Sequence, residues 1–351
     1  MRASSFLFSF AVSLLTFTTV SAEKPFDFAS TPGKLPKNVV PEEYAIRITP
    51  DIAKRTLSGS ETIKVNAREA VKQIVLNAAD IKITKATMDG KAIPASAIKL
   101  DEKEETLTLA SEVGGGNHEL QLEFTGKINQ RGIGLYYATY QEHGTGTKKT
   151  MLGTQFEATD ARRMFPCWDE PSFRARFQLT VVIPENFVGV SNMPIEQEQK
   201  VTGGKEVRFG TTPSMASYLN VFCAGELDAI HNKNGDVTHG VIATKGKAEM
   251  GRYALESSQQ ILNYYNDYFG QPYPLPKLDH IAVPGGFGGA MENWGGITYF
   301  ESGLLFDPER SSIQTRQGIY EVIAHETAHQ WFGDLVTMAW WDNLWLNEGF
   351  A

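Results

Sequence analysis

The chain has 351 residues, of which 42% are hydrophobic and 21% are charged, and its formal net charge is −8. This length is enough for two domains or more, and the composition is that of an ordinary globular protein. The acidic balance and the absence of a Lys/Arg run exclude a basic nucleic-acid-binding protein, so nucleic acid is not an expected partner.

The first residues have the pattern of a targeting segment. Arg2 supplies a short positive region, residues 6–20 are apolar but too few to span a bilayer comfortably, and residues 20–22 form a small-residue cleavage site. We interpret residues 1–22 as a signal peptide, and its removal changes the net charge to 32 − 41 = −9. The protein is therefore expected to be exported, either periplasmic or secreted, with no stable membrane insertion after cleavage. An uncleaved membrane anchor is the alternative.

Cysteine usage is sparse, with only Cys167 and Cys223 present. A disulfide-stapled extracellular scaffold is therefore excluded. One bridge between the two residues and two buried free thiols are both open, and the free thiols are favoured. No asparagine lies in an Asn-x-Ser/Thr sequon, which favours a bacterial periplasm over a eukaryotic secretory route.

A polar, proline-rich stretch follows the signal segment, and we expect it to be poorly ordered over residues 23–41. Hydrophobic and polar residues then alternate with the period of a half-buried strand. The clearest alternating segments are 61–65, 105–109, 118–124 and 173–181. Glycine-containing turns separate the strands. The pattern predicts one antiparallel β domain over residues 44–227, preceded by a lead at 23–43.

The hydrophobic period changes from strand to helix in the last third of the chain. Apolar residues recur at helical spacing over residues 253–269, and Gly270 ends the run. The next expected elements are a strand at 278–283, a Gly-rich loop at 285–289 and a strand near 297–300. Asp307 followed by proline predicts a capped helix that runs to His329, either continuous or with a break. Residues 228–351 are therefore expected to form a second, mixed α and β domain.

The strongest chemical signal is a His-Glu-Thr-Ala-His run on this last helix. His325 and His329 are four residues apart, so a helix places both imidazoles on one face, where they can bind one metal ion. Glu326 projects beside them and can reach a metal-bound water, which is the HExxH pattern of zinc hydrolases. A catalytic zinc site usually has three protein ligands, and Glu348, which 18 residues separate from His329, is the strongest candidate for the third. A second helix starting near Asp342 would return Glu348 to the metal.

This motif, with Asn347 before Glu348 and Gly-Phe-Ala after it, resembles the M1 family of zinc aminopeptidases. The resemblance implies one zinc ion per chain, bound by His325, His329 and Glu348. It implies that Glu326 is the general base, which takes a proton from the attacking water and delivers it to the leaving amine. It also implies a mostly β N-terminal saddle domain followed by an α+β thermolysin-like catalytic domain.

Two further segments carry the resemblance and imply where the substrate binds. The family's exopeptidase signature matches five consecutive residues here: Gly289, Ala290, Met291, Glu292 and Asn293. In the family, this strand pairs with the peptide backbone and its glutamate holds the free α-amine. The segment with Gln155 and Glu157 resembles the family's second substrate segment, with Glu157 in the position of a second amine-binding acid. Two carboxylates would hold one ammonium strongly, so the expected substrates are peptides with a free N-terminus.

In the M1 family the catalytic domain continues beyond the position of Ala351, with a tyrosine that donates to the oxyanion and a large helical C-terminal domain. We therefore interpret the sequence as an N-terminal fragment with a truncated catalytic domain. We expect the fragment alone to be inactive and poorly folded at its C-terminal end, where apolar and aromatic residues would be exposed. Its parent is expected to be a zinc metallo-aminopeptidase.

Two other functions compete with this interpretation. A leukotriene A4 hydrolase-like bifunctional M1 enzyme would carry glutamine in place of Glu157 and glycine in place of Ala290. A non-catalytic M1-like scaffold that binds partners would tend to lose the metal ligands, which are all present here. The five histidines outside the motif have no ligand spacing and are interpreted as surface or core residues: His118, His143, His231, His239 and His280.

Overall fold

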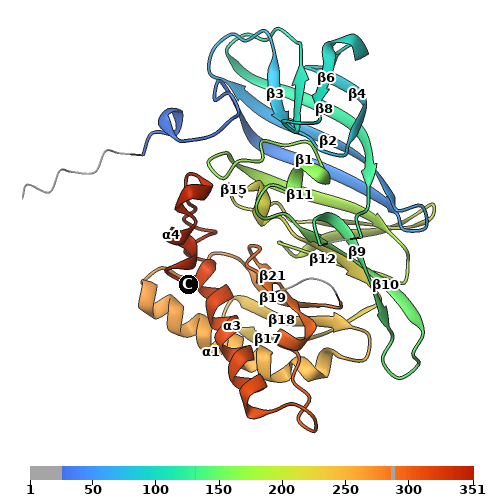
Figure 1. Cartoon of the computed structure of the whole chain (residues 1–351), viewed down its shortest axis with the longest axis vertical. Helices are drawn as coiled ribbons and strands as arrows, with labels where there is room; N and C mark the ends of the chain where they lie inside the picture. The colour runs from blue at the N-terminus through green and yellow to red at the C-terminus, as the bar shows by residue number, and fades with distance from the viewer. Residues whose placement is uncertain (1–25, 131, 286–288) are drawn as a thin grey trace, which may run out of the picture.

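The computed structural model describes residues 26–130, 132–285 and 289–351. The predicted signal peptide lies outside these ranges and is not tested. The described residues form four β-sheets (Figure 1). Three of them lie wholly before residue 227, and the longer helices are found only after residue 250, interleaved with strands of the fourth. This arrangement, a mostly β region and then an α+β region, confirms the predicted fold class.

The largest sheet has nine strands and forms the body of the N-terminal region. In spatial order its strands are β13 (Ile195–Val201), β14 (Gly204–Phe209), β11 (Arg174–Ile183), β1 (Val39–Asp51), β2 (Thr56–Ala67), β8 (Gly116–Lys127), β4 (Lys82–Met88) and β5 (Lys91–Ala92), with β15 (Met215–Ala216) paired to β11. The predicted alternation holds in β2 and β8, where Ile63 and Leu120 are fully buried and their chain neighbours are more exposed. The β1–β11 pair is parallel, so the region is not purely antiparallel as expected.

Two smaller sheets complete the N-terminal region. One consists of β3 (Ile74–Asn77), β7 (Thr106–Leu109) and β6 (Ile98–Asp101), in that order. The other consists of β12 (Val188–Ser191), β16 (Phe222–Gly225), β10 (Lys148–Gln155) and β9 (Gly134–Gln141). Short 3-10 turns lie at η1 (Phe28–Ser30), η2 (Ala95–Ala97), η3 (Ala161–Arg163), η4 (Ser217–Leu219) and η5 (Ala248–Gly251). Because β10 ends at Gln155, the next residues of the chain include the predicted amine-binding acid Glu157.

The stretch before β1 is more ordered than the sequence predicted. Strand β1 already begins at Val39, and Leu35 is buried. The backbone amides of Lys34 and Leu35 both donate to Oε1 of Glu170, at 2.6 and 2.9 Å. The expectation of a poorly ordered lead up to residue 41 is therefore wrong for its described part, because a buried carboxylate far along the chain fixes it.

The second region is built on a mixed five-stranded sheet. Its strand order is β17 (Leu227–Asn234), β18 (Val237–Thr244), β19 (Lys277–Val283), β21 (Gly296–Phe300) and β20 (Ala290–Met291), with β18, β19 and β21 mutually parallel. Helix α1 (Arg252–Phe269) contacts β17 and β18 and packs against α3 (Ile313–His329) (Figure 1). As predicted, Gly270 ends α1, and its φ of 65° is accessible to glycine without strain. The predicted domain boundary at residue 227 falls at the start of β17 and stays a prediction.

The helix predicted to begin at Asp307 begins later. After α2 (Glu301–Leu304), Asp307 accepts the amide of Glu309 in a turn, at 3.0 Å. The N-cap of α3 is Ser312, whose Oγ accepts the amide of Thr315 at 3.2 Å. The prediction was wrong because both residues are good caps and only one precedes a continuous helix. The chain then turns through η6 (Trp341–Asn343) into α4 (Trp345–Glu348).

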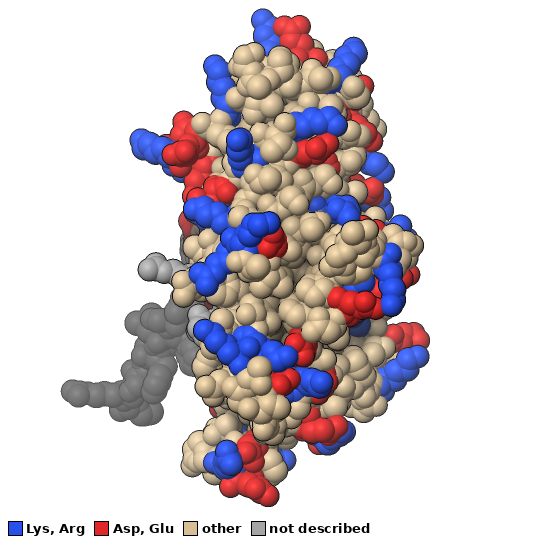
Figure 2. Space-filling view, turned by 90° about the vertical axis from the view of Figure 1, so that its right-hand side faces the viewer, with Lys and Arg blue, Asp and Glu red and all other residues tan. Residues whose placement is uncertain are grey.

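The remaining expectations concern the cysteines, the C-terminal aromatic residues, the surface charges and membrane-spanning helices. Cys167 and Cys223 are both buried free thiols. The C-terminal aromatic residues are exposed only in part, because Trp345 and Phe350 are exposed whereas Trp340 and Trp341 are half-buried. Figure 2 shows basic and acidic side chains interspersed over the face in view, without a large basic patch. Among the described helices, none has the length and apolar character needed to cross a bilayer.

Candidate active site

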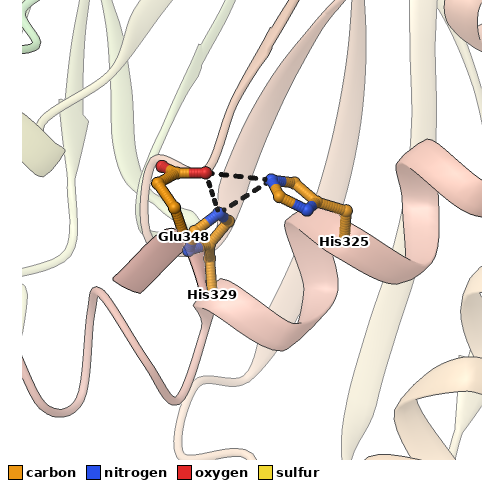
Figure 3. Close-up of side chains that lie close together, drawn as sticks. All are labelled: His325, His329 and Glu348. Atoms are coloured by element: carbon orange, nitrogen blue, oxygen red, sulfur yellow. Dashed lines mark hydrogen bonds and ion pairs between the residues drawn. The ribbon is translucent and has the colours of Figure 1, made fainter. Parts of the chain in front are cut away.

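The two histidines of the HExxH run face one carboxylate (Figure 3). His325 and His329 lie one turn apart on α3, and their Nε2 atoms are 3.0 Å apart. Glu348, at the end of α4, places its Oε2 3.4 Å from Nε2 of His325 and 3.6 Å from Nε2 of His329. The structure therefore brings together all three residues predicted as metal ligands.

The spacing of these three atoms fits a metal ion. Zinc binds nitrogen and oxygen ligands at about 2.0–2.2 Å with tetrahedral angles, which puts two ligand atoms roughly 3.3–3.6 Å apart. The measured separations of 3.0, 3.4 and 3.6 Å lie near this range. Two imidazoles and one carboxylate leave a fourth position for water or substrate, and this donor set suits a catalytic zinc.

The imidazoles are held in the form that binds a metal. Nδ1 of His329 lies 2.9 Å from the carbonyl oxygen of Phe332, so Nδ1–H donates there and Nε2 keeps its lone pair. Burial lowers the pKa of both His325 and His329, which favours the neutral rings.

Gly333 follows α3 and has a φ of 144°, which favours glycine. A Cβ at this position would lie 3.1 Å from the carbonyl oxygen of His329.

Glu326 is a buried acid beside this cluster, with 6% of its surface exposed. Its Oε2 has no hydrogen-bond partner among the described residues. Burial raises the pKa of Glu326 well above its ordinary value, and the charges of Glu292 and Glu348 raise it further. An unpartnered carboxylate oxygen next to a metal site is free to accept a proton, as a general base must.

A second acidic cluster adjoins the first and shares Glu348 with it. One carboxylate oxygen each of Glu157, Glu292 and Glu348 lies within 4.8 Å of the other two. Burial raises the pKa of Glu157 to about 8 and of Glu292 to about 7, and the nearby carboxylates contribute to both shifts. Glu292 is buried, Glu157 is half-buried and Glu348 is exposed. Three carboxylates this close repel one another unless a cation joins them, so the cluster is suited to bind a positive group.

The remaining predicted substrate residues lie around this second cluster. Ala290 and Met291 form β20, which pairs with β21, and Gly289 precedes them with a φ of 109°. Asn293 is fully buried, and its Nδ2 lies 3.3 Å from Oγ1 of Thr298. Gln155, the last residue of β10, has a buried Oε1 without a described partner. These placements test no role in substrate binding, and the roles stay predictions.

Comparison with known proteins identifies the family. A family model described as the Peptidase M1 N-terminal domain matches residues 40–219, and one described as the Peptidase family M1 domain matches residues 253–351. The chain belongs to the M1 peptidase family. Together with the fold, this confirms the resemblance inferred from the HExxH run and from the Gly-Ala-Met-Glu-Asn run at residues 289–293.

Curated M1 relatives cover nearly all of the chain. Aminopeptidase N of Acetobacter pasteurianus is 47% identical over 96% of this chain and 98% of its own length. Aminopeptidase M1 of Arabidopsis thaliana is 42% identical over 91% of this chain, and mitochondrial aminopeptidase 2 of Saccharomyces cerevisiae is 40% identical over 90%. The chain spans only 37% and 34% of the lengths of these two relatives.

The M1 site contains a residue that the sequence analysis missed. The side-chain amide of Gln330 donates from Nε2 to the carbonyl oxygen of Glu292 at 2.9 Å. Its Oε1 accepts the amide of Gly295 at 3.1 Å, and the residue is fully buried. Gln330 therefore joins the helix that carries the histidines to the segment that carries Glu292. The only signal in the sequence is a lone amide beside His329, ahead of two aromatic residues.

A cavity of about 770 Å³ opens beside His325 and the acid Glu326. Its lining residues come from β20, β21, α2 and α3 and include Ala290, Tyr299, Tyr320 and Val322. Glu157 and Glu292 do not line it. The cavity therefore does not include these two acids of the second cluster.

A buried hydrogen-bonded chain runs behind this cavity from Tyr299 to His239. The hydroxyl of Tyr299 lies 2.8 Å from Nδ1 of His280, Nε2 of His280 lies 2.6 Å from Oγ of Ser258, and Oγ of Ser258 lies 2.8 Å from Nδ1 of His239. All four side chains are fully buried. His239 and His280 are therefore core residues, which is one of the two expected placements. The hydrogen-bonded network that they share was not predicted.

This network predicts that acid destabilises the fold. Burial lowers the pKa of His239 to about 4 and of His280 to about 3, from an ordinary value of 6.5. The unfolded chain therefore binds protons below pH 6.5 while the folded chain does not, and stability present above pH 6.5 is lost as the pH falls towards 4. Each histidine contributes about 1.4 kcal/mol per pH unit in this window.

The measurement is denaturant unfolding of the wild type and of His280→Gln at pH 6.5 and 5.0. The glutamine amide can still bridge Ser258 and Tyr299 but does not titrate. Between the two pH values, the variant should lose roughly 1.5–2 kcal/mol less stability than the wild type. The matched variant His143→Gln, at an exposed position, should behave as the wild type. Equal losses in His280→Gln and the wild type would contradict the prediction.

Proposed function

We propose that this chain carries the zinc and amine-binding site of an M1 aminopeptidase, which removes the N-terminal residue from peptides. The observation that carries the proposal is the pair of adjoining clusters: His325, His329 and Glu348 on one side, and Glu157 and Glu292 on the other. Relatives with aminopeptidase names over nearly the whole chain support it. The proposal concerns the complete gene product, because the plant and yeast relatives are longer than this chain.

The three-residue cluster would hold the metal. Zinc bound there would polarise the scissile carbonyl and activate a water molecule. His329 is fixed by its bond to the carbonyl of Phe332, so its Nε2 stays directed at the ion position. His325 and Glu348 are each about two-fifths exposed, which leaves their side of the site open to substrate.

Glu326 would move the proton. Its unpartnered Oε2 accepts the proton of the attacking water and then delivers it to the nitrogen that leaves. The surrounding burial and acidic charges raise the proton affinity of this carboxylate, so it holds the proton between the two steps.

Glu157 and Glu292 would grip the α-ammonium of the peptide. An enzyme that cuts after the first residue must recognise the free end at a fixed distance from the scissile bond. Two carboxylates next to Glu348 provide this distance, because they adjoin the metal cluster. Gln155 and β20 lie beside them and are proposed to contact the first residue and the peptide backbone. We further propose that the protein is exported, on the basis of its N-terminal sequence.

Metal binding tests the proposal directly. The wild-type chain should retain one zinc ion after dialysis, measured by mass spectrometry. His325→Ala and Glu348→Ala should each lower zinc affinity by more than about 100-fold, since each removes a ligand. The matched control is His143→Ala, because this histidine is exposed and lies outside the cluster. Equal zinc content in the wild type and in the His325→Ala/Glu348→Ala double variant would overturn the assignment.

A further inference from the structure

The residues after Glu157 are fixed by charged contacts. Strand β10 ends at Gln155, and the amide of Asp160 donates to the carbonyl oxygen of Phe156 at 2.8 Å, which closes a turn around Glu157. This turn leads directly into η3 (Ala161–Arg163). The place of the Glu157 carboxylate therefore depends on what holds residues 160–163.

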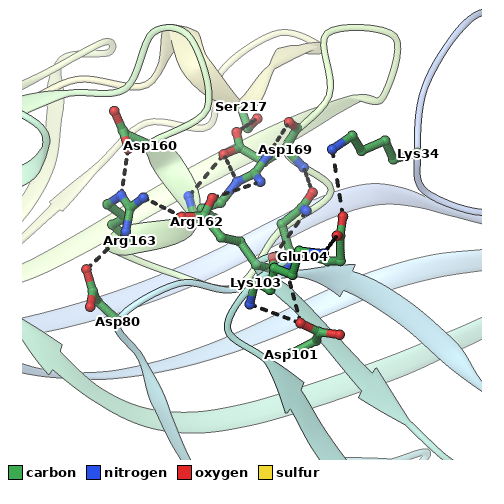
Figure 4. A network of polar contacts seen from close by, with 12 residues as sticks. Lys34, Asp80, Asp101, Lys103, Glu104, Asp160, Arg162, Arg163, Asp169 and Ser217 are labelled. Atoms are coloured by element: carbon green, nitrogen blue, oxygen red, sulfur yellow. Dashed lines mark hydrogen bonds and ion pairs between the residues drawn. The ribbon is translucent and has the colours of Figure 1, made fainter.

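Two neighbouring arginines hold this segment through different partners (Figure 4). Arg162 is buried, and its Nε donates to Oδ2 of Asp169 at 2.9 Å. Arg163 donates from Nε to Oδ1 of Asp160 at 2.7 Å and from Nη1 to Oδ2 of Asp80 at 3.0 Å. Each arginine thus has carboxylate partners that the other does not contact.

Glu105 is the carboxylate that joins the two arginines. Its Oε2 lies 3.3 Å from Nη1 of Arg162, and its Oε1 pairs with Nη2 of Arg163. Among the ion pairs of the described residues, no other acid contacts both guanidinium groups. Two adjacent cations in a partly buried place repel each other, and a carboxylate between them removes this repulsion.

The backbone of Glu105 is fixed within the sheet of β3, β7 and β6, which is not the sheet that contains β10. The residue lies in the turn between β6 and β7 and has a φ of 52°, which is uncommon for a residue other than glycine. Its carbonyl oxygen accepts the amide of Ala78 at 3.0 Å and Nδ2 of Asn77 at 3.3 Å, both at the end of β3. The Glu105 side chain thereby connects the three-stranded sheet to the segment that follows Glu157. Two other contacts join the same parts: the amide of Ala79 donates to the carbonyl oxygen of Arg162 at 3.0 Å, and Asp80 pairs with Arg163.

We propose that Glu105 is a positioning residue for the amine site. Its carboxylate bridges Arg162 and Arg163 and so fixes the position of η3 and of the turn that contains Glu157. In this position Glu157 and Glu292 can bind one ammonium group together. This inference rests on the proposed function of the two acids. Glu105 does not touch the substrate; it acts through the arginines.

The test compares two ligands that differ only in the ammonium group. L-leucine hydroxamate and its desamino analogue, 4-methylpentanoyl hydroxamate, share the metal-binding group and the side chain. The dissociation constant of the desamino ligand divided by that of L-leucine hydroxamate, both measured by calorimetry on the zinc-loaded chain, reports how strongly the site binds the ammonium. Glu105→Gln should lower this ratio at least about fivefold and leave the affinity for the desamino ligand unchanged, because a charged hydrogen bond contributes roughly 10- to 100-fold. Glu104→Gln, at a half-exposed position in the same turn, should leave the ratio unchanged.

A second measurement needs no metal. The amide of Asp160, which donates a hydrogen bond to the carbonyl oxygen of Phe156, should exchange with solvent at least about tenfold faster in Glu105→Gln than in Glu104→Gln.

Two outcomes of the hydroxamate experiment would contradict the proposal. If Glu105 had a purely structural role, its replacement would weaken the binding of both hydroxamates in the same proportion, and that result would overturn the proposal. The variant Glu157→Gln distinguishes a failure of the proposed amine site from a failure of the role proposed for Glu105. If it leaves the ratio unchanged, the amine site itself is wrong; if it lowers the ratio and Glu105→Gln does not, only the role of Glu105 fails.

Discussion

Replacing Glu326 with glutamine is expected to lower the turnover of the complete gene product at least about 100-fold while zinc stays bound. Glutamine keeps the shape of the side chain, and Glu326 is not one of the three residues of the metal cluster. The amide cannot take a proton from water at Oε2, which is buried and unpartnered in the wild type. The measurement combines single-turnover hydrolysis of an amino-acid anilide with zinc content per chain.

Two variants make this result specific. Glu309→Gln changes an exposed glutamate just before α3 and should keep full turnover. Glu326→Asp keeps the charge but withdraws the carboxylate by one methylene group, so its turnover should lie between that of the wild type and that of Glu326→Gln. Near-normal turnover in Glu326→Gln with zinc bound would mean that another group activates the water.

The parts of this site that the sequence predicts are those with a fixed local spacing. His325 and His329 share a helix face because four residues make about one turn, and this holds whatever else the helix contacts. The strand pattern that predicted β2 and β8 is equally local, since alternate residues face opposite sides of a sheet. The prediction of Glu348 as the third ligand depends less on local geometry. It rests on the number of residues between His329 and Glu348, which resembles the spacing in the M1 family.

The parts that the sequence could not predict depend on contacts between distant residues. Glu105 and Arg163 are 58 positions apart, and nothing near either residue shows that they meet. The hydrogen-bonded chain from His239 to Tyr299 joins four elements, and its histidines have no ligand spacing. The start of α3 shows the same limit at short range, because Asp307 and Ser312 both have the chemistry of a helix cap and only tertiary packing decides between them.

Blocking the substrate amine should have the other large effect. N-acetylation removes the ammonium that Glu157 and Glu292 are proposed to hold, and it leaves the half-buried Glu157 and the buried Glu292 without a cation. The loss of a charge-assisted contact costs about 2–4 kcal/mol in the transition state, or roughly 30- to 1000-fold in kcat/KM. The measurement is kcat/KM of the complete gene product for a peptide and for its N-acetyl derivative.

The variant Glu292→Gln decides where this discrimination arises. Its kcat/KM for the free peptide should fall towards the value for the acetylated peptide, and its rate on the acetylated peptide should change little, since that substrate has no ammonium to lose. A preference for free amines that survives in Glu292→Gln and in Glu157→Gln would place the recognition elsewhere. Comparable cleavage of both peptides by the wild type would make the protein an endopeptidase. The burial that raises the pKa of Glu157 and Glu292 argues against this outcome, because such acids gain most when a cation binds between them.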